Sequence, residues 1–208
     1  MGQINSTLIE WGAAASALPG QSVSGDRCVV APFPGGVLVA VADGLGHGNE
    51  ASLAAEIAVA TLVKYAAESV IALVQRCHEA LLRTRGVVMS LASFNGQDNT
   101  MAWMGVGNVE GVLFHADAKA SPLRETILLR GGTVGYMLPP LRASVLPVAR
   151  GDTLIFVTDG IRSSFAGDLA LAASSRAPQQ IADGILSRHS RQTDDALALV
   201  ARYLGGNT

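Results

Sequence analysis

The residues V-A-V-A-D-G-L-G-H-G, from Val39 to Gly48, set a pattern that recurs elsewhere in this chain. The apolar run ends at Asp43, three glycines follow within five positions, and Asn49 and Glu50 then open a long alanine-rich segment. This pattern predicts a buried strand with a carboxylate at its end, a loop of small residues, and a helix. Glycines let a backbone approach a ligand closely and a helix N-terminus favours an anion, so a metal-bound phosphate would suit the loop. A solvated aspartate in a tight turn is the alternative.

The composition predicts a single globular domain spanning residues 1–208. Hydrophobic residues make up 49% of the 208 residues and charged residues 15%, so the core is expected to be aliphatic. No apolar run reaches the roughly 18 residues that span a bilayer, which argues against a membrane protein. The net charge of −2 and the lack of a basic run argue against a nucleic-acid partner. Cys28 and Cys77 are far apart, as expected for reduced thiols in a cytoplasmic protein.

A predicted hairpin precedes the glycine loop. The segment 27–31 is expected to form a strand that begins at or just after Asp26, and the segment 37–42 a strand that ends at Asp43. The P-F-P-G-G connection between them is short, as in a hairpin. The two aspartates could therefore lie at the same end of a sheet, although the sequence leaves the register open.

The remaining pattern predicts an α+β fold. The expected helices cover residues 50–65, 69–84 and 178–189. The expected later strands cover residues 86–94, 100–106, 109–115, 126–130, 144–148, 153–157 and 196–203. Short strands separated by tight turns indicate antiparallel sheets, and amphipathic or alanine-rich helices indicate that the sheets are covered. We therefore expect a β-sandwich flanked by helices on its outer faces.

Acidic residues recur at strand ends along the chain. Asp159-Gly160 follows the apolar run 154–157, and Asp194-Asp195 directly precedes the run 196–200. Together with Asp26 and Asp43 they form a set of carboxylates without histidine or cysteine, which selects Mg²⁺ or Mn²⁺ over zinc. Two such ions about 3.5–4 Å apart can hold a hydroxide and orient a phosphoryl group. Solvated turns remain the alternative, and the pattern does not identify the substrate.

Three motifs resemble those of metal-dependent Ser/Thr protein phosphatases of type 2C, the PPM family. They read A-D-G-L-G-H-G-N-E-A (42–51), G-D-T-L-I-F-V-T-D-G-I (151–161) and T-D-D-A-L-A-L-V (193–200), in the order that the family shows. The S-G-D at 24–26 and the D-G-x-G-H-G pattern resemble its bacterial SpoIIE-like branch. The short length and the segment G-T-V-G-Y-M-L-P-P-L (132–141) are similar to the stand-alone stressosome phosphatases of that branch.

The resemblance implies an α-β-β-α sandwich that holds two Mn²⁺ or Mg²⁺ ions between its sheets. Asp43 would bridge both ions, Asp159 would bind one of them, and both residues would be catalytic. Asp194 is favoured over Asp195 because the ligand is the first residue of the family's closing motif. The phosphate would then be bound through the ions and not by loop amides. The implied ligand set is Asp26 in a supporting role, Asp43, the Gly44 carbonyl, Asp159, Asp194 and Asp195.

The sequence also departs from the eukaryotic members of the family. Those members place a histidine, a proposed general acid, directly after Asp-Gly, where this chain has Leu45. His47 lies two residues later and is a candidate general acid, or simply a loop histidine. The phosphate-binding arginine of those members has no matching motif, and Arg27 is a candidate by position alone.

The resemblance implies a cytoplasmic phosphatase that acts on phosphoserine and phosphothreonine of STAS-domain proteins, the scaffold and sensor subunits of a stressosome. Metal-activated water would attack phosphorus directly, without a phosphoenzyme, and the reaction would reset the stress pathway. One alternative is a catalytically weak docking module of the same fold in a sigma-factor pathway. Another is a hydrolase of small phosphate esters.

Overall fold

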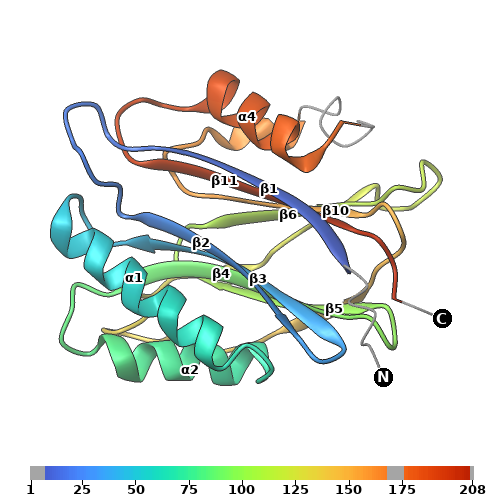
Figure 1. The fold of residues 1–208 in the computed structure, drawn as a ribbon, viewed down its shortest axis with the longest axis horizontal. Helices are drawn as coiled ribbons and strands as arrows, with labels where there is room; N and C mark the ends of the chain where they lie inside the picture. Colours follow the sequence, from blue (N-terminus) through green and yellow to red (C-terminus); the bar gives the residue numbers. More distant parts are fainter. Residues whose placement is uncertain (1–7, 168–175, 207–208) are drawn as a thin grey trace, which may run out of the picture.

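The computed structural model describes residues 8–167 and 176–206. Two β-sheets stack face to face, with helices on both outer faces (Figure 1). Helices α1 (Asn49–Lys64) and α2 (Val70–Leu81) cover one sheet, and α4 (Pro178–His189) covers the other. The predicted α+β fold, an α-β-β-α sandwich, is confirmed.

The sheet under α4 has the strand order β1-β11-β10-β6-β7. Its strands are β1 (Ile9–Ser16), β6 (Glu110–Phe114), β7 (Arg124–Thr126), β10 (Thr153–Val157) and β11 (Ala196–Tyr203). A 3-10 helix, η1 (Ser163–Gly167), follows β10. All pairings in this sheet are antiparallel.

The sheet under α1 and α2 has the order β2-β3-β4-β5-β8, with β9 also paired to β5. Its strands are β2 (Asp26–Phe33), β3 (Gly36–Gly44), β4 (Val87–Asn95), β5 (Thr100–Val106), β8 (Leu129–Arg130) and β9 (Ser144–Pro147). In this sheet the β5–β8 pair is parallel, and all other strand pairs are antiparallel.

Strand β3 is apolar on both faces because it is covered on both. Alternate side chains of a strand point to opposite sides of the sheet. Leu38 and Ala40 pack in the cluster beneath α1 and α2, whereas Val39 and Val41 pack between the two sheets, with Phe156 of β10. This double burial explains the continuous apolar run that ends at Asp43.

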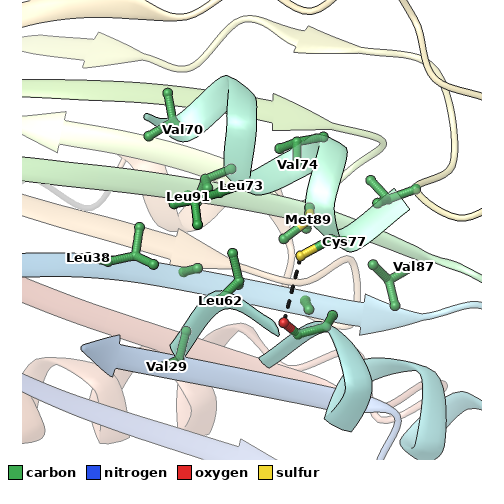
Figure 2. Close-up of a cluster of buried hydrophobic side chains, with 14 of the residues drawn as sticks. Val29, Leu38, Leu62, Val70, Leu73, Val74, Cys77, Val87, Met89 and Leu91 are labelled. Carbon is green, nitrogen blue, oxygen red and sulfur yellow. Dashed lines mark hydrogen bonds between the residues drawn. The ribbon is translucent and has the colours of Figure 1, made fainter. Parts of the chain in front are cut away.

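The helix-covered cluster beneath α1 and α2 also contains one of the two cysteines (Figure 2). Cys77 on α2 packs near Met89 and its thiol donates a hydrogen bond to the Ala58 carbonyl of α1 at 3.7 Å. Burial raises the pKa of the Cys77 thiol to about 12, and it also raises the pKa of the half-buried Cys28. Both cysteines are free thiols, and neither is poised as a nucleophile.

One predicted strand, residues 126–130, is wrong. The chain instead forms β7, which pairs with β6 in one sheet, and β8, which pairs with β5 in the other. Ile127 lies between them, buried in the cluster between the sheets. The segment crosses from one sheet to the other, which interrupts a run that looks continuous in the sequence.

The expected helices form with small shifts at their ends. Ser69 caps α2 by accepting a hydrogen bond from the Ala72 amide at 3.3 Å. Within the described ranges, no helix is both long and apolar enough to cross a membrane.

Candidate metal centre

The strand-end aspartates meet at one end of the sandwich. Antiparallel pairing of β2 with β3 places Asp26 directly opposite Asp43, which settles the register that the sequence left open. In the other sheet, β10 pairs with β11 so that Asp159 follows one strand and Asp194 precedes its neighbour. Each sheet therefore contributes carboxylates to the same end of the sandwich.

A hydrogen bond between the two sheets holds Asp26. The Thr158 hydroxyl donates to the Asp26 carboxylate at 2.8 Å and accepts from the Leu197 amide at 2.9 Å. Both Asp26 and Thr158 are buried. This bridge joins the open end of the β2-β3 hairpin to the adjacent ends of β10 and β11.

Asp195 and Asp194 have different environments. The buried Asp195 carboxylate accepts hydrogen bonds from the Leu18 amide at 2.7 Å and the Gly25 amide at 2.6 Å, one on each oxygen. Asp194 is exposed, and one of its oxygens accepts from the Asp195 amide at 2.9 Å. Backbone donors already engage both Asp195 oxygens, so the geometry favours Asp194 as the carboxylate available to an ion.

Burial and mutual repulsion disfavour the charged forms of the clustered carboxylates. Burial raises the pKa of Asp43 to about 8 and that of Asp26 to about 7, and repulsion from neighbouring carboxylates adds to both shifts. Burial and repulsion by Asp194 also raise the pKa of Asp159, although a hydrogen bond from Asn108 and the charge of Arg191 oppose this. Buried like charges favour neutral acids unless a cation compensates them.

This donor set fits a hard divalent cation, because it offers carboxylate and carbonyl oxygens without histidine or cysteine. No three His, Cys, Asp or Glu side chains in the described ranges stand close enough together to hold an ion as they are. A bound ion would therefore have to draw the Asp43, Asp159 and Asp194 side chains inward. The exposure of Asp159 and Asp194 leaves them room to move.

Comparison with known proteins identifies the family. Residues 34–204 match the family described as stage II sporulation protein E, SpoIIE. The chain belongs to the SpoIIE family. It is a protein phosphatase, which confirms the predicted enzyme class.

Individual relatives agree with this SpoIIE-family assignment. The phosphoserine phosphatase RsbX of Bacillus subtilis (strain 168) is 27% identical over 143 residues, which cover 68% of this chain and 69% of RsbX. One similar solved structure comes from work on the bacterial stressosome, described as a modular system that has been adapted to control secondary messenger signaling. Its TM-score is 0.86 at 31% identity, and the match covers 93% of this chain and 99% of that one. RsbX in complex with magnesium has a TM-score of 0.82 at 20% identity, covering 94% and 95% of the two chains.

The glycine loop of this SpoIIE-family protein is held tightly beside the carboxylates. The Gly44 amide donates to the Gly25 carbonyl at 3.1 Å, and the Leu45 amide donates to the Gly86 carbonyl at 3.1 Å. A Cβ atom on Gly44 would lie 2.0 Å from the Ala51 carbonyl oxygen, so only glycine fits between the loop and α1. The backbone at the candidate carbonyl ligand is therefore fixed by packing.

His47 is an exposed loop residue, whereas Arg27 is held by several hydrogen bonds. His47 is exposed on the loop, and no residue that the structure describes forms an ion pair with it, so its role as general acid stays a prediction. Arg27 donates to the Ser24 carbonyl, to Ser52 and to Glu56, at 2.8, 2.6 and 3.0 Å. These bonds join the start of β2 to α1 and give the Arg27 side chain a structural task. Phosphate binding by Arg27, a candidate by position alone, stays a prediction.

Sequence reasoning missed three residues that surround the carboxylates. Thr158 had a local signal, because it stands directly before Asp159 in the T-D-G motif. Asn108, which donates to Asp159 at 2.8 Å, and Arg191, whose amide donates to the Gly160 carbonyl at 2.8 Å, come from distant turns. Nothing in the local sequence around either residue indicates its neighbour.

Proposed function

We propose that this SpoIIE-family protein is a Mn²⁺- or Mg²⁺-dependent phosphatase of phosphoserine and phosphothreonine in proteins. The observation that carries the proposal is the gathering of Asp26 and Asp43 from one sheet with Asp159 and Asp194 from the other. A divalent cation would relieve the repulsion among these carboxylates, and this favours its binding. The relation to RsbX, a phosphoserine phosphatase, supports the choice of substrate class.

The proposed ligands divide by position. Asp43, the Gly44 carbonyl, Asp159 and Asp194 would hold the two ions, with Asp43 placed centrally among them. Asp26 supports Asp43 from the neighbouring strand. Asp195 accepts hydrogen bonds from the Leu18 amide, after β1, and the Gly25 amide, before β2, and so holds these two segments together. When bound, two such ions supply a nucleophile from water near neutral pH and neutralise the phosphoryl oxygens.

Arg191 is the proposed side-chain contact for the phosphoryl group. Its backbone is fixed against Gly160, next to Asp159, and its charge opposes the rise in the pKa of Asp159. The side chain is exposed, and no ion pair involving it occurs among the described residues. A guanidinium in this position can form paired hydrogen bonds with phosphate.

The proposed substrates are phosphorylated STAS-domain proteins, the scaffold and sensor subunits of a stressosome, which the enzyme resets in the cytoplasm. Similarity to a structure from work on the stressosome, at 31% identity over 93% of the chain, supports this partner class. Two free thiols suit a reducing compartment.

The test is to incubate the protein with phosphorylated STAS-domain and sensor proteins, with Mn²⁺ and with a chelator, and to follow the intact mass of each substrate. We expect loss of one phosphate mass per site with Mn²⁺ and none with chelator. Binding without phosphate loss would indicate the docking-module alternative instead. Faster turnover of a generic aryl phosphate than of any phosphoprotein would indicate the small-ester hydrolase.

A further inference from the structure

The turn at residues 133–137 exposes two large apolar side chains beside the candidate metal centre. Tyr136 is 84% exposed and Met137 is 62% exposed. Both lie in the G-T-V-G-Y-M-L-P-P-L segment, to which the proposed chemistry assigns no task. Leu82, at the end of α2, and Leu45, directly after Gly44, are also exposed. We call Leu45, Leu82, Tyr136 and Met137 the apolar turn patch.

Strand register places this turn near the carboxylates. Gly44 of β3 pairs with Val87 of β4, and Val87 in turn pairs with Val134. Neighbouring strands are about 4.8 Å apart, so Val134 lies roughly 10 Å from Gly44 across the sheet. The Leu45 amide bond to the Gly86 carbonyl brings the glycine loop to the same connection. The turn therefore lies beside the candidate metal centre, although none of its residues is a candidate ligand.

The backbone of the turn is firmly anchored although its side chains are exposed. Val134 exchanges two hydrogen bonds with Val87, each 2.9 Å, and Thr133 exchanges bonds of 2.8 and 2.9 Å with Met137. The Gly135 amide donates to Nδ1 of His78 on α2 at 3.0 Å. A Cβ on Gly135 would lie 2.6 Å from the Leu81 Cβ atom, so the turn is packed closely against the helix end.

We propose that the apolar turn patch is the docking surface for the folded phosphoprotein substrate, a proposal that rests on the proposed phosphatase function. Leu45 directly follows Gly44, so a protein whose phosphorylated residue reaches Asp43 would also cover Leu45 and, across β4, the turn that bears Tyr136 and Met137. Tyrosine and methionine are enriched in the cores of protein interfaces. Because the anchored turn holds them in place before binding, little conformational freedom is lost when the partner docks.

The patch would act on recognition and not on chemistry. We expect a small aryl phosphate at the carboxylates to leave Tyr136 and Met137 uncovered, whereas a docked protein substrate would cover them. Loss of the patch should therefore separate the two substrate types. It should leave stability unchanged, because side chains this exposed contribute little to the core.

The experiment compares a Tyr136→Ala/Met137→Ala double variant with a matched Trp11→Ala/Val145→Ala control. Trp11 and Val145 are similarly exposed, at 50% and 64%, but lie on β1 and β9. The probes are a phosphorylated STAS-domain protein and a generic aryl phosphate, both with Mn²⁺. We expect kcat/KM for the phosphoprotein to fall by about 10- to 100-fold in the patch variant, mainly through KM, with aryl phosphate turnover unchanged. The control should match wild type with both substrates.

Other results would overturn the inference. Equal losses with both substrates would show that the turn supports the metal centre, and unchanged phosphoprotein kinetics would show that the substrate docks elsewhere. Failure of the wild-type protein itself to release phosphate from any phosphoprotein would instead refute the proposed function, and this inference with it. Thermal unfolding of each variant checks that the fold is intact.

Discussion

Replacing Thr158 with valine tests the bridge that joins the two sheets at the metal centre. Valine has nearly the same shape as threonine but lacks the hydroxyl, so Thr158→Val removes both the bond to Asp26 and the bond from Leu197. The side chain is buried, and water cannot replace either partner readily. The Leu197 amide and the Asp26 carboxyl are then left unsatisfied.

The magnitude follows from these two lost bonds. Each buried polar group left without a partner costs about 1–3 kcal/mol, so the variant should lose about 2–6 kcal/mol of folding stability. For a domain of this size that lowers Tm by about 4–24 °C. The pKa of Asp26 should also rise further, because its hydrogen bond from Thr158 opposes the effect of burial.

The assay is thermal unfolding of wild type, Thr158→Val and Thr158→Ser in metal-free buffer at one pH. Serine keeps the hydroxyl, so the Thr158→Ser variant should retain most of the stability and lose only one methyl contact. A Thr158→Val variant that unfolds at the wild-type temperature would refute the view that this hydroxyl holds the sheets in register at the site.

Three further predictions concern the carboxylates and their counter-charge. Asp195→Asn should lower stability by about 1–3 kcal/mol because it weakens the bonds from the Leu18 and Gly25 amides to this buried side chain. Asp194→Asn should unfold like wild type yet lose Mn²⁺-dependent turnover, and equal stability of the two variants would contradict this division. Arg191→Ala should raise KM for aryl phosphate and weaken inhibition by inorganic phosphate by about tenfold, with partial recovery in Arg191→Lys; unchanged phosphate inhibition would exclude the contact. Because the folded pKa values of Asp26 and Asp43, about 7 and about 8, exceed the unfolded value of 3.8, the metal-free fold holds protons more tightly. Its stability should therefore fall as pH rises from about 4 to about 8, and Mn²⁺ should raise Tm more at pH 8 than at pH 6; pH-independent stabilisation by Mn²⁺ would argue against these ligands.

Local patterns in the sequence predict the elements that carry the site. The run that ends at Asp43 predicts β3 because both faces of that strand are buried, and the alanine-rich run after Gly48 predicts α1 because small residues let the helix lie close to the sheet. The hairpin and the strand-end position of Asp159 also follow from neighbouring residues alone.

Contacts between distant segments account for what the sequence does not predict. The register that pairs Asp26 with Asp43, and the Thr158 bridge, depend on how two sheets stack. The crossing at Ile127 depends on the same stacking, because a buried residue between two sheets looks like any strand residue in sequence. The different surroundings of Arg27 and Arg191 are likewise set by partners far along the chain.

The central claim is that carboxylates from both sheets bind two divalent ions and that these ions are needed for phosphate release. The most direct measurement is a Mn²⁺ titration by calorimetry, together with phosphate release in metal-defined buffer, for wild type, Asp43→Asn and Asp183→Asn. Asp183 is exposed on α4, the helix on the outer face of the sandwich, where the Gln179 side chain donates to it, and it serves as the matched control. We predict two bound ions and phosphate release for wild type and Asp183→Asn, and the loss of both for Asp43→Asn. Wild-type turnover by Asp43→Asn would contradict the account.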